Sequence, residues 1–410
     1  MKKILILGAG TAGTMMAVKL RRALDAGDWS ITIIDRDDRH VYQPGLLFIP
    51  FGIYTERDLY KSRARFIPYG VTLVYGETEA IEPDRNRVRL SDGRQFAYDL
   101  LIVATGSRIV PAETPGLLEG GWRRNVFDFY TADGALALAD RLRTWKGGRL
   151  VVNLVDMPIK CPVAPLEFVF LADWYFHTQG IRRDVELVYA TPLSGPFTRQ
   201  RCSDALSGLL AGREVRTETQ FAVERVDAEG GSLRGYDGRE LPFDLLVTIP
   251  IHRGSELIAR SGIGDELDFI PTNRHTLQAE HWPNMFVIGD ATNLPSSKAG
   301  SVAHFQADVL LDNVLRWIGG RELEPGFDGH ANCFIETGFG RAVLVDFNYD
   351  VEPVPGKFPL PGAGPFTLLA ESEANHWGKM AFRWVYWNLL LKGADLSAIG
   401  PQMALAGKQI

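Results

Sequence analysis

Residues 4–13 read Ile4-Leu5-Ile6-Leu7-Gly8-Ala9-Gly10-Thr11-Ala12-Gly13, and this stretch decides the fold of the chain. The four apolar residues predict a buried strand, and the G-x-G-x-x-G pattern after them leads into a helical stretch over residues 14–24. Gly8 permits the tight turn, Gly10 lets the backbone approach a pyrophosphate, and Gly13 allows the helix to pack closely on the strand. We therefore predict a dinucleotide-binding fold in which these three glycines and Ala12 contact the nucleotide.

Later motifs identify the nucleotide. A strand over residues 30–34 ends at Asp35, where a carboxylate can accept hydrogen bonds from ribose. Residues 100–107 form an apolar strand followed by Ala104-Thr105-Gly106, and residues 284–288 form a strand that delivers Gly289-Asp290. In this order the motifs resemble those of two-dinucleotide-domain flavoproteins. The resemblance implies FAD, with Thr105 and Gly106 at the closing turn and Asp290 on the ribityl or pyrophosphate end.

The same resemblance implies further cofactor contacts. The helix after Gly300 would point its N-terminus toward the flavin ring, where its dipole favours an anionic reduced flavin. Ala80 falls where the backbone contacts the adenine, and Pro44 falls beside the ring system.

A second strand-turn-helix unit begins at residue 148. The loop over residues 156–165 lies where related reductases carry the glycine fingerprint for NAD(P)H, but here it contains no glycine and three prolines. Prolines remove amide donors, so we predict that NAD(P)H is not the electron donor. The loop instead presents Cys161 at the start of a helix, preceded by Lys160. Both features are expected to lower the thiol pKa; a small buried core cysteine is the alternative.

Four motifs then follow one another: Lys160-Cys161-Pro162; Ser296-Ser297-Lys298-Ala299-Gly300 with Phe305-Gln306-Ala307; Cys333-Phe334-Ile335-Glu336-Thr337-Gly338; and His376-Trp377-Gly378-Lys379. Together they resemble sulfide:quinone oxidoreductases over almost the whole chain, with the flavin subunit of flavocytochrome c sulfide dehydrogenase as a close relative. The resemblance implies that Cys161 and Cys333 flank the flavin as a redox pair. Sulfide attacks their disulfide, one sulfur carries the persulfide, and the other thiolate passes two electrons to the flavin.

The resemblance also implies that a quinone accepts the electrons. Lys298 matches a lysine near the flavin and quinone end, and Lys379 and Phe382 match the quinone pocket, where Phe382 would stack on the ring. A solvated loop lysine and a plain amphipathic helix are the alternatives. Many family members carry a third cysteine near residues 125–130; because none is present here, we expect FAD to be bound noncovalently. Cys202 lies outside both cysteine motifs, and we interpret it as a bystander.

The C-terminal segment over residues 379–392 is rich in aromatic residues and flanked by lysines. It is too short to span a bilayer and suits a helix lying in the membrane interface, with a core or dimer-packing helix as the alternative. The apolar start of the chain is too short for a signal peptide and has no cleavage site. We therefore expect peripheral, monotopic attachment to the cell membrane without a signal peptide.

The charge and the cysteine content of the chain argue against several classes of partner and site. A net charge of −6 without a long Lys/Arg run argues against nucleic acid, and three cysteines without C-x-x-C give neither a disulfide framework nor a metal site.

The predicted fold class is α/β, with two Rossmann-like domains plus a C-terminal region carrying the membrane-interface segment. We predict an FAD domain over residues 1–110 and 245–320, a second nucleotide-like domain over 111–244, and a redox-cysteine and quinone region over 321–410.

Other functions remain open from the sequence. A type II NADH:quinone oxidoreductase is the main alternative, although the loop over residues 156–165 lacks the glycines that would bind NADH. A flavin-bearing sulfur-transfer subunit without quinone activity, electron transfer to a haem partner, and a polysulfide or another thiol as substrate also fit the residues. The sequence leaves open whether the chain forms a homo-oligomer.

Overall fold

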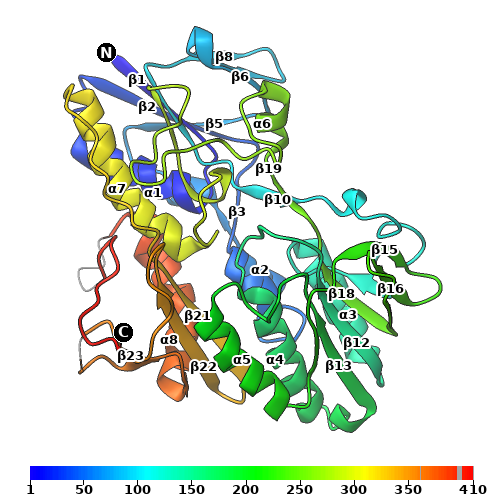
Figure 1. Ribbon diagram of the computed structural model, residues 1–410. Helices are drawn as coiled ribbons and strands as arrows, with labels where there is room; N and C mark the ends of the chain where they lie inside the picture. Colours follow the sequence, from blue (N-terminus) through cyan, green and yellow to red (C-terminus); the bar gives the residue numbers. More distant parts are fainter. Residues whose placement is uncertain (361, 395–398, 410) are drawn as a thin grey trace.

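The computed structural model describes residues 1–360, 362–394 and 399–409 and contains two parallel sheets, each covered by helices (Figure 1). The first sheet has the strand order β20-β9-β1-β2-β5, and all its neighbouring strands are parallel. Its strands are β1 (Lys2–Leu7), β2 (Trp29–Asp35), β5 (Val71–Tyr75), β9 (Leu100–Val103) and β20 (Met285–Val287). Strands distant in sequence therefore build one nucleotide-binding sheet, as the motifs predict.

Two helices pack on one another beside this sheet. Helix α1 (Thr11–Ala23) starts directly after the glycine turn, and α7 (Gly300–Ile318) starts at the predicted glycine; the two helices are in contact. Both lie in the upper part of Figure 1. Buried apolar side chains run along α1 from Ala12 to Leu20, so the hydrophobic effect holds it against the sheet.

The second sheet has the order β11-β18-β12-β13-β14 and is also parallel throughout. Its strands are β11 (Val126–Phe127), β12 (Gly148–Leu154), β13 (Val185–Ala190), β14 (Arg216–Glu218) and β18 (Leu245–Ile249). Its helices are α3 (Ala132–Thr144), α4 (Ala164–Thr178) and α5 (Gln200–Gly212). Because β18 pairs with β12, residues 245–249 belong to this sheet, whereas the predicted division assigned them to the FAD domain. By strand pairing, that boundary falls after residue 249.

Smaller elements connect and edge the two sheets. Strands β10 (Ser107–Ile109) and β19 (His252–Gly254) form an antiparallel ribbon between them. The remaining small sheets contain β3 (Arg39–Val41) and β4 (Tyr60–Ser62); β6 (Thr78–Glu82), β7 (Arg87–Leu90) and β8 (Gln95–Ala97); and β15 (Val223–Asp227), β16 (Ser232–Gly235) and β17 (Glu240–Pro242). Short helices are α2 (Glu56–Leu59), α6 (Glu256–Ser261), and the 3₁₀ turns η1 (Gln43–Phe48) and η6 (Gly289–Ala291).

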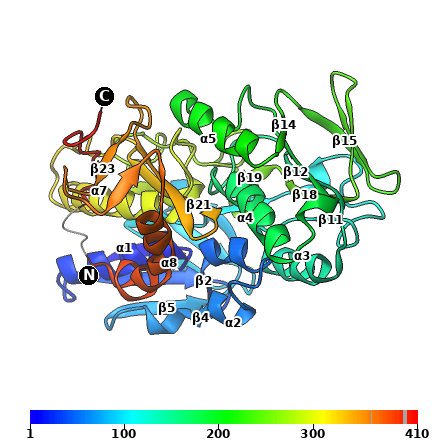
Figure 2. The same ribbon diagram turned by 90° about the horizontal axis from the view of Figure 1, so that it is seen from below.

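The C-terminal region forms a third sheet. Strands β21 (Ala331–Gly338) and β22 (Arg341–Phe347) make an antiparallel pair, extended by β23 (Gly356–Phe358), β24 (Phe366–Leu368) and β25 (Glu371–Ser372). Helix α8 (Glu373–Asn388) and the turn η7 (Leu390–Lys392) follow, and β21 lies against α4 of the second sheet in both views (Figure 2). The main buried cluster joins all three regions, since Ile4, Val152 and Val343 belong to it.

The predicted membrane-interface segment differs from the observed surface of α8. Tyr386, Trp387, Leu390 and Leu391 are buried in the main cluster, because the end of α8 packs on α1 and on His40 of β3. These side chains cannot face lipid. The strongly exposed aromatic side chains of α8 are Trp377 and Trp384, of which Trp377 lies outside the predicted segment. Within the described residues, none of the helices combines the length and apolar character needed to cross a bilayer.

Candidate active site

The glycine turn leaves an open cradle at the start of α1. A Cβ on Gly8 would lie 2.4 Å from the Ala104 carbonyl oxygen, and one on Gly13 would lie 1.8 Å from the Gly8 carbonyl oxygen. Neither position tolerates a side chain. A Cβ on Gly10, in contrast, would meet nothing within 4 Å. The backbone at Gly10 therefore borders free space at the helix N-terminus, where a pyrophosphate would be stabilised.

The second and third motifs border the same cradle. The hydroxyl of Thr105 is buried without a hydrogen-bond partner among the described residues. A Cβ on Gly289 would lie 3.4 Å from the Ala12 Cβ, so the two motifs face one another. Asp290 accepts one hydrogen bond from Ser107, at 3.2 Å. An unpaired buried hydroxyl, a free glycine face and a carboxylate with remaining acceptor capacity fit the diphosphate and ribityl groups of FAD.

Protein groups already bind the Asp35 carboxylate. Its Oδ2 accepts from the Ala9 backbone amide at 2.7 Å and pairs with Arg63 at 2.8 Å, while Oδ1 accepts from the Arg36 amide. Arg63 also donates to the Ala9 carbonyl. This network fixes the glycine turn to the end of β2. A role of Asp35 toward ribose would use its remaining lone pairs and stays a prediction.

The two other predicted FAD contacts lie on separate elements. Ala80 lies on β6, opposite Arg89 of β7. Pro44 lies at the start of η1, next to Gln43, whose side-chain oxygen accepts a hydrogen bond from Lys160 at 3.3 Å.

The loop after β12 holds Cys161 in a fixed backbone position. Its φ of +49° lies in the left-handed region, which is unusual for a residue with a side chain. The Cys161 amide donates to the Lys298 carbonyl at 2.6 Å, and the Cys161 carbonyl accepts from the Tyr130 hydroxyl at 3.3 Å. The loop that enters α7 therefore anchors this cysteine.

Cys333 reaches the same place from β21. The carbonyl of its neighbour Asn332 accepts a hydrogen bond from Ser301 in the first turn of α7, at 2.8 Å. Both cysteine segments are thus tied to residues 298–301. Both cysteines are free and belong to partly exposed residues, and the charge of Cys161 raises the pKa of Cys333. Tertiary structure brings together two cysteines that are far apart in sequence.

The expected lowering of the Cys161 pKa is wrong. Burial raises the pKa of this thiol to about 12, and the Glu167 carboxylate acts in the same direction. Lys160 extends toward Gln43, and the cation that favours the thiolate is Lys379 on α8. Lys160 also interacts with the charge of Cys161, but the lysine that lowers the pKa of Cys161 comes from the C-terminal helix.

A buried ion pair lies beside the cysteines. Lys379 Nζ lies 2.6 Å from Glu167 Oε1 and donates to the Phe334 carbonyl at 3.0 Å. Burial disfavours the charged lysine, but Glu167 and the charges of Cys161 and Cys333 together outweigh it and raise the pKa of Lys379. Glu167 is completely buried, and its Oε2 has no hydrogen-bond partner among the described residues. The sequence reasoning missed Glu167, although one carboxylate in the otherwise apolar start of α4 was a usable signal.

A second carboxylate adjoins this pair. Glu336 of β21 donates its backbone amide to Glu167 Oε1 at 2.8 Å. Its own carboxylate lies 2.9 Å from Nδ1 of His376 on α8. Burial raises the pKa of Glu336, although the His376 hydrogen bond opposes this. Glu167 therefore contacts the backbone of Glu336, and the Glu336 carboxylate contacts a partly exposed histidine.

Lys298 and Phe382, the other two residues predicted to bind the quinone, differ in burial and in their contacts. Lys298 is buried, donates to the carbonyls of Asp290 and Thr292, and lies 3.9 Å from the Phe269 ring centre. Burial lowers its pKa to about 8. It is therefore a structural anchor of the loop and not a solvated surface lysine. Phe382 is partly buried on α8, with its ring centre 6.4 Å from that of Tyr386.

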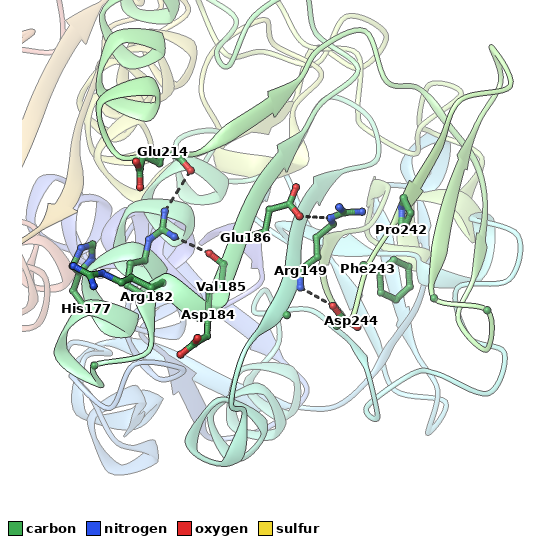
Figure 3. Close-up of a pocket in the computed structure, with 15 residues that line it drawn as sticks. Arg149, His177, Arg182, Asp184, Val185, Glu186, Glu214, Pro242, Phe243 and Asp244 are labelled. Atoms are coloured by element: carbon green, nitrogen blue, oxygen red, sulfur yellow. Dashed lines mark hydrogen bonds and ion pairs between the residues drawn. The ribbon is translucent and has the colours of Figure 1, made fainter.

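Two other features lie outside this site. Cys202 is fully buried on α5. An open groove of about 1330 Å³ lies at the amino ends of β12 and β13 (Figure 3). There Arg149 pairs with Glu186 at 2.7 Å, and the Arg149 amide donates to Asp244. Ligands of parallel sheets bind at the carboxyl ends of the strands, so this groove is not the nucleotide site.

Comparisons with known proteins agree with this arrangement. Residues 2–152 match the family described as pyridine nucleotide-disulphide oxidoreductase. The chain is 27% identical to the mitochondrial sulfide:quinone oxidoreductase of Mus musculus, over 95% of this chain and 86% of that protein. It is 31% identical to a type II NADH:quinone oxidoreductase of Staphylococcus aureus, over 87% of this chain and 92% of that protein.

The fold also has a solved counterpart. The structure of the sulfide:quinone oxidoreductase from Aquifex aeolicus superposes with a TM-score of 0.80 at 20% identity, covering 96% of this chain and 92% of that one. The likeness therefore extends over both Rossmann-like sheets and the C-terminal region.

Proposed function

This chain belongs to the sulfide:quinone oxidoreductase family of two-dinucleotide-domain flavoproteins, and we propose that it oxidises sulfide through Cys161 and Cys333 and passes the electrons to a membrane quinone. FAD, when bound, supplies the two-electron carrier between the sulfur and the quinone. One observation carries the proposal: both cysteine segments are hydrogen-bonded to residues 298–301, where the loop after the Asp290 motif enters α7.

Cysteine, lysine and glutamate side chains have separate roles in the proposed reaction. Sulfide attacks one sulfur of the Cys161–Cys333 disulfide, so a new S–S bond forms and the old one breaks. The bond's electron pair remains on the other cysteine as a thiolate, which Lys379 stabilises. We propose that the S–H proton of the persulfide passes to Glu167, whose Oε2 lacks a hydrogen-bond partner within the described structure. Polysulfide could enter by the same attack.

The cofactor contacts belong to the same proposal. We propose that Gly10 and the α1 N-terminus bind the pyrophosphate of FAD and that the Thr105 hydroxyl donates to it. We propose further that the Asp290 carboxylate accepts from the ribityl hydroxyls and that no covalent bond is formed. The empty space at Gly10 and the unpaired Thr105 hydroxyl support this assignment. On the quinone side we propose Phe382 and Lys379, with Lys298 supporting the loop.

The first test compares electron donors. Anaerobic sulfide is expected to bleach the flavin of the purified protein, whereas NADH is expected to leave it oxidised. The physical reason is the loop after β12, which lacks glycine and contains three prolines, so it offers few amide donors to a pyrophosphate. Flavin absorbance in a stopped-flow spectrometer provides the measurement.

The competing function has one observation in its favour. The identity to a type II NADH:quinone oxidoreductase, 31%, is higher than the 27% to the mouse sulfide enzyme, although it covers less of this chain. Rapid bleaching by NADH with no response to sulfide would replace the proposal with that activity. Bleaching by sulfide without any reduction of added quinone would favour a sulfur-transfer subunit.

We propose that α8 attaches the protein to the membrane surface. Trp377 and Trp384 are 68% and 62% exposed and stand seven positions apart, so they lie on one side of the helix, with exposed Ala381 between them. Indole rings on an exposed helix face suit the interface between water and lipid. An apolar quinone would then enter without crossing water.

Replacing both tryptophans is expected to weaken membrane binding. Trp377→Ala/Trp384→Ala should reduce binding to phosphatidylcholine–phosphatidylglycerol vesicles by about tenfold or more, because each substitution removes a large apolar area. Sulfide bleaching should stay unchanged, and vesicle co-sedimentation measures the difference. Tyr69→Ala, which removes an exposed aromatic ring far from α8 in sequence, serves as the control. Equal binding of wild type and double variant would contradict interfacial attachment.

A further inference from the structure

We propose that Glu336 and His376 form a proton relay that carries protons released by sulfide oxidation from the cysteine site to solvent. This inference rests on the proposed function and deepens it by assigning the exit route of the proton. Each turnover removes two electrons from sulfide, and its S–H proton must leave a site where burial raises the pKa of both thiols. A proton taken by Glu167 needs a further acceptor, because Glu167 is completely buried.

The geometry of Glu167 supplies the inner end of the route. Its Oε1 is used twice, by Lys379 and by the Glu336 amide, whereas its Oε2 has no partner among the described residues. An ionised carboxylate oxygen buried without a donor is costly. Binding a proton removes that cost, so this oxygen is suited to receive one.

The outer end consists of Glu336 and His376. Glu336 is 2% exposed, and both of its oxygens lie within 3.0 Å of His376 Nδ1. The His376 side chain is 20% exposed, so it connects the buried carboxylate with water. Imidazole has two nitrogens, and it can accept a proton at one and release it from the other.

The relay runs along two elements that already contact each other. Helix α8 contributes His376 and, one turn later, Lys379, while β21 contributes Cys333 and Glu336. In the proposed relay a proton moves from the persulfide to Glu167, then to the carboxylate of Glu336, the residue whose backbone amide is hydrogen-bonded to Glu167 Oε1, and then through His376 to solvent. The electron pair moves separately: the deprotonated persulfide sulfur forms a new S–S bond with the second cysteine sulfur, and bound FAD would accept the two electrons released and pass them to a quinone. The bridge between the cysteines is thereby restored with one additional sulfur, which the next sulfide can attack.

Other charged groups surround Glu336. Lys379 from α8 lowers the pKa of Glu336, and Glu167 from α4 raises it. Tyr54, before α2, responds to the Glu336 charge. Arg213, after α5, binds the carbonyl of the neighbouring Thr337 and pairs with Glu371. Of the titratable groups that approach Glu336 within the described chain, His376 is the one hydrogen-bonded to its carboxylate.

The experiment separates the two half-reactions of the holoenzyme. In His376→Ala, sulfide-driven flavin reduction is expected to slow about tenfold at neutral pH, less than the roughly 100-fold or larger effect of a general acid–base group that acts directly on the reacting atoms. Added imidazole should restore it. Re-oxidation of dithionite-reduced enzyme by a short-chain ubiquinone analogue should stay within about twofold of wild type. Glu336→Gln should slow the same step without rescue by imidazole.

The pH profile adds a readout that a purely structural role would not move. An acceptor works only when deprotonated, so the reduction rate falls as pH falls through the pKa of the relay. Because the His376 hydrogen bond lowers the pKa of Glu336, its removal should move this acidic limb to higher pH. FAD content and melting temperature of each variant establish that it is folded.

The matched control is His281→Ala. His281 is exposed, and its ring contacts that of the next residue, Trp282, edge-on at 5.7 Å between ring centres. His376 contacts Trp377 in the same way at 5.3 Å. Unlike His376, His281 has no buried carboxylate partner in the described structure. It should leave both half-reactions unchanged. The relay would be overturned if His376→Ala reduced its flavin at the wild-type rate with an unchanged acidic limb of the pH profile. A defect confined to re-oxidation by quinone would overturn it as well. Failure of sulfide to reduce the wild-type flavin would instead refute the proposed function.

Discussion

Replacing Cys161 or Cys333 with serine is expected to lower the rate of sulfide-driven flavin reduction by about a thousandfold or more, as is typical when a nucleophile is removed. Serine cannot form the disulfide that sulfide attacks, and a lone remaining thiol can neither exchange nor release an electron pair by this route. Neither segment should lose its fold, because the anchoring hydrogen bonds at Cys161 and Asn332 involve the backbone.

Cys202→Ala provides the matched control. Cys202 is fully buried on α5, in neither cysteine motif, and its replacement should leave the reduction rate unchanged. Anaerobic stopped-flow absorbance of the flavin gives the rate, and mass spectrometry gives the persulfide on the remaining cysteine. A Cys333→Ser protein that sulfide still bleaches at the wild-type rate would refute the two-cysteine mechanism and leave Cys161 alone as the sulfur carrier.

The second large effect is expected from Lys379→Met. The substitution leaves the Glu167 carboxylate buried without a cation, and breaking a buried ion pair in this way costs about 3–5 kcal/mol. The melting temperature of the holoenzyme should fall by about 3–6 °C. Lys379 also favours both thiolates, so its loss should slow flavin reduction as well.

A double variant tests whether the loss belongs to the pair. In Glu167→Gln/Lys379→Met no buried charge remains, and the oxygen of the introduced side-chain amide would still accept from the Glu336 backbone, so more than half of the lost stability should return. Calorimetry of wild type, both single variants and the double variant completes the cycle. A double variant as unstable as Lys379→Met would mean that the two side chains contribute independently.

Helix α8 carries both the residues of the cysteine site and the tryptophans proposed to bind the membrane. Its inner face holds Lys379 and His376 against Glu167 and Glu336, while its outer face carries Trp377 and Trp384. One helix therefore borders the cysteine site on one side and, in our proposal, the membrane on the other. Vesicle binding and sulfide bleaching should respond to different substitutions on the same helix.

The sequence alone determined the nucleotide fold and the order of its motifs. The strand at Leu7, the glycine turn, the turn at Thr105 and the strand before Asp290 all lie where they were predicted, because hydrophobic pattern and glycine position act locally. The family resemblance was likewise available, since it depends on short motifs in a fixed order.

Only the tertiary structure decided the electrostatics of the site. Lys160 adjoins Cys161 in sequence yet binds Gln43, while Lys379 and Glu167 reach the thiols from α8 and α4. Burial then reverses the expected shift of the Cys161 pKa. Charge interactions depend on distance in space and on exclusion of water, and neither quantity is encoded by neighbours along the chain.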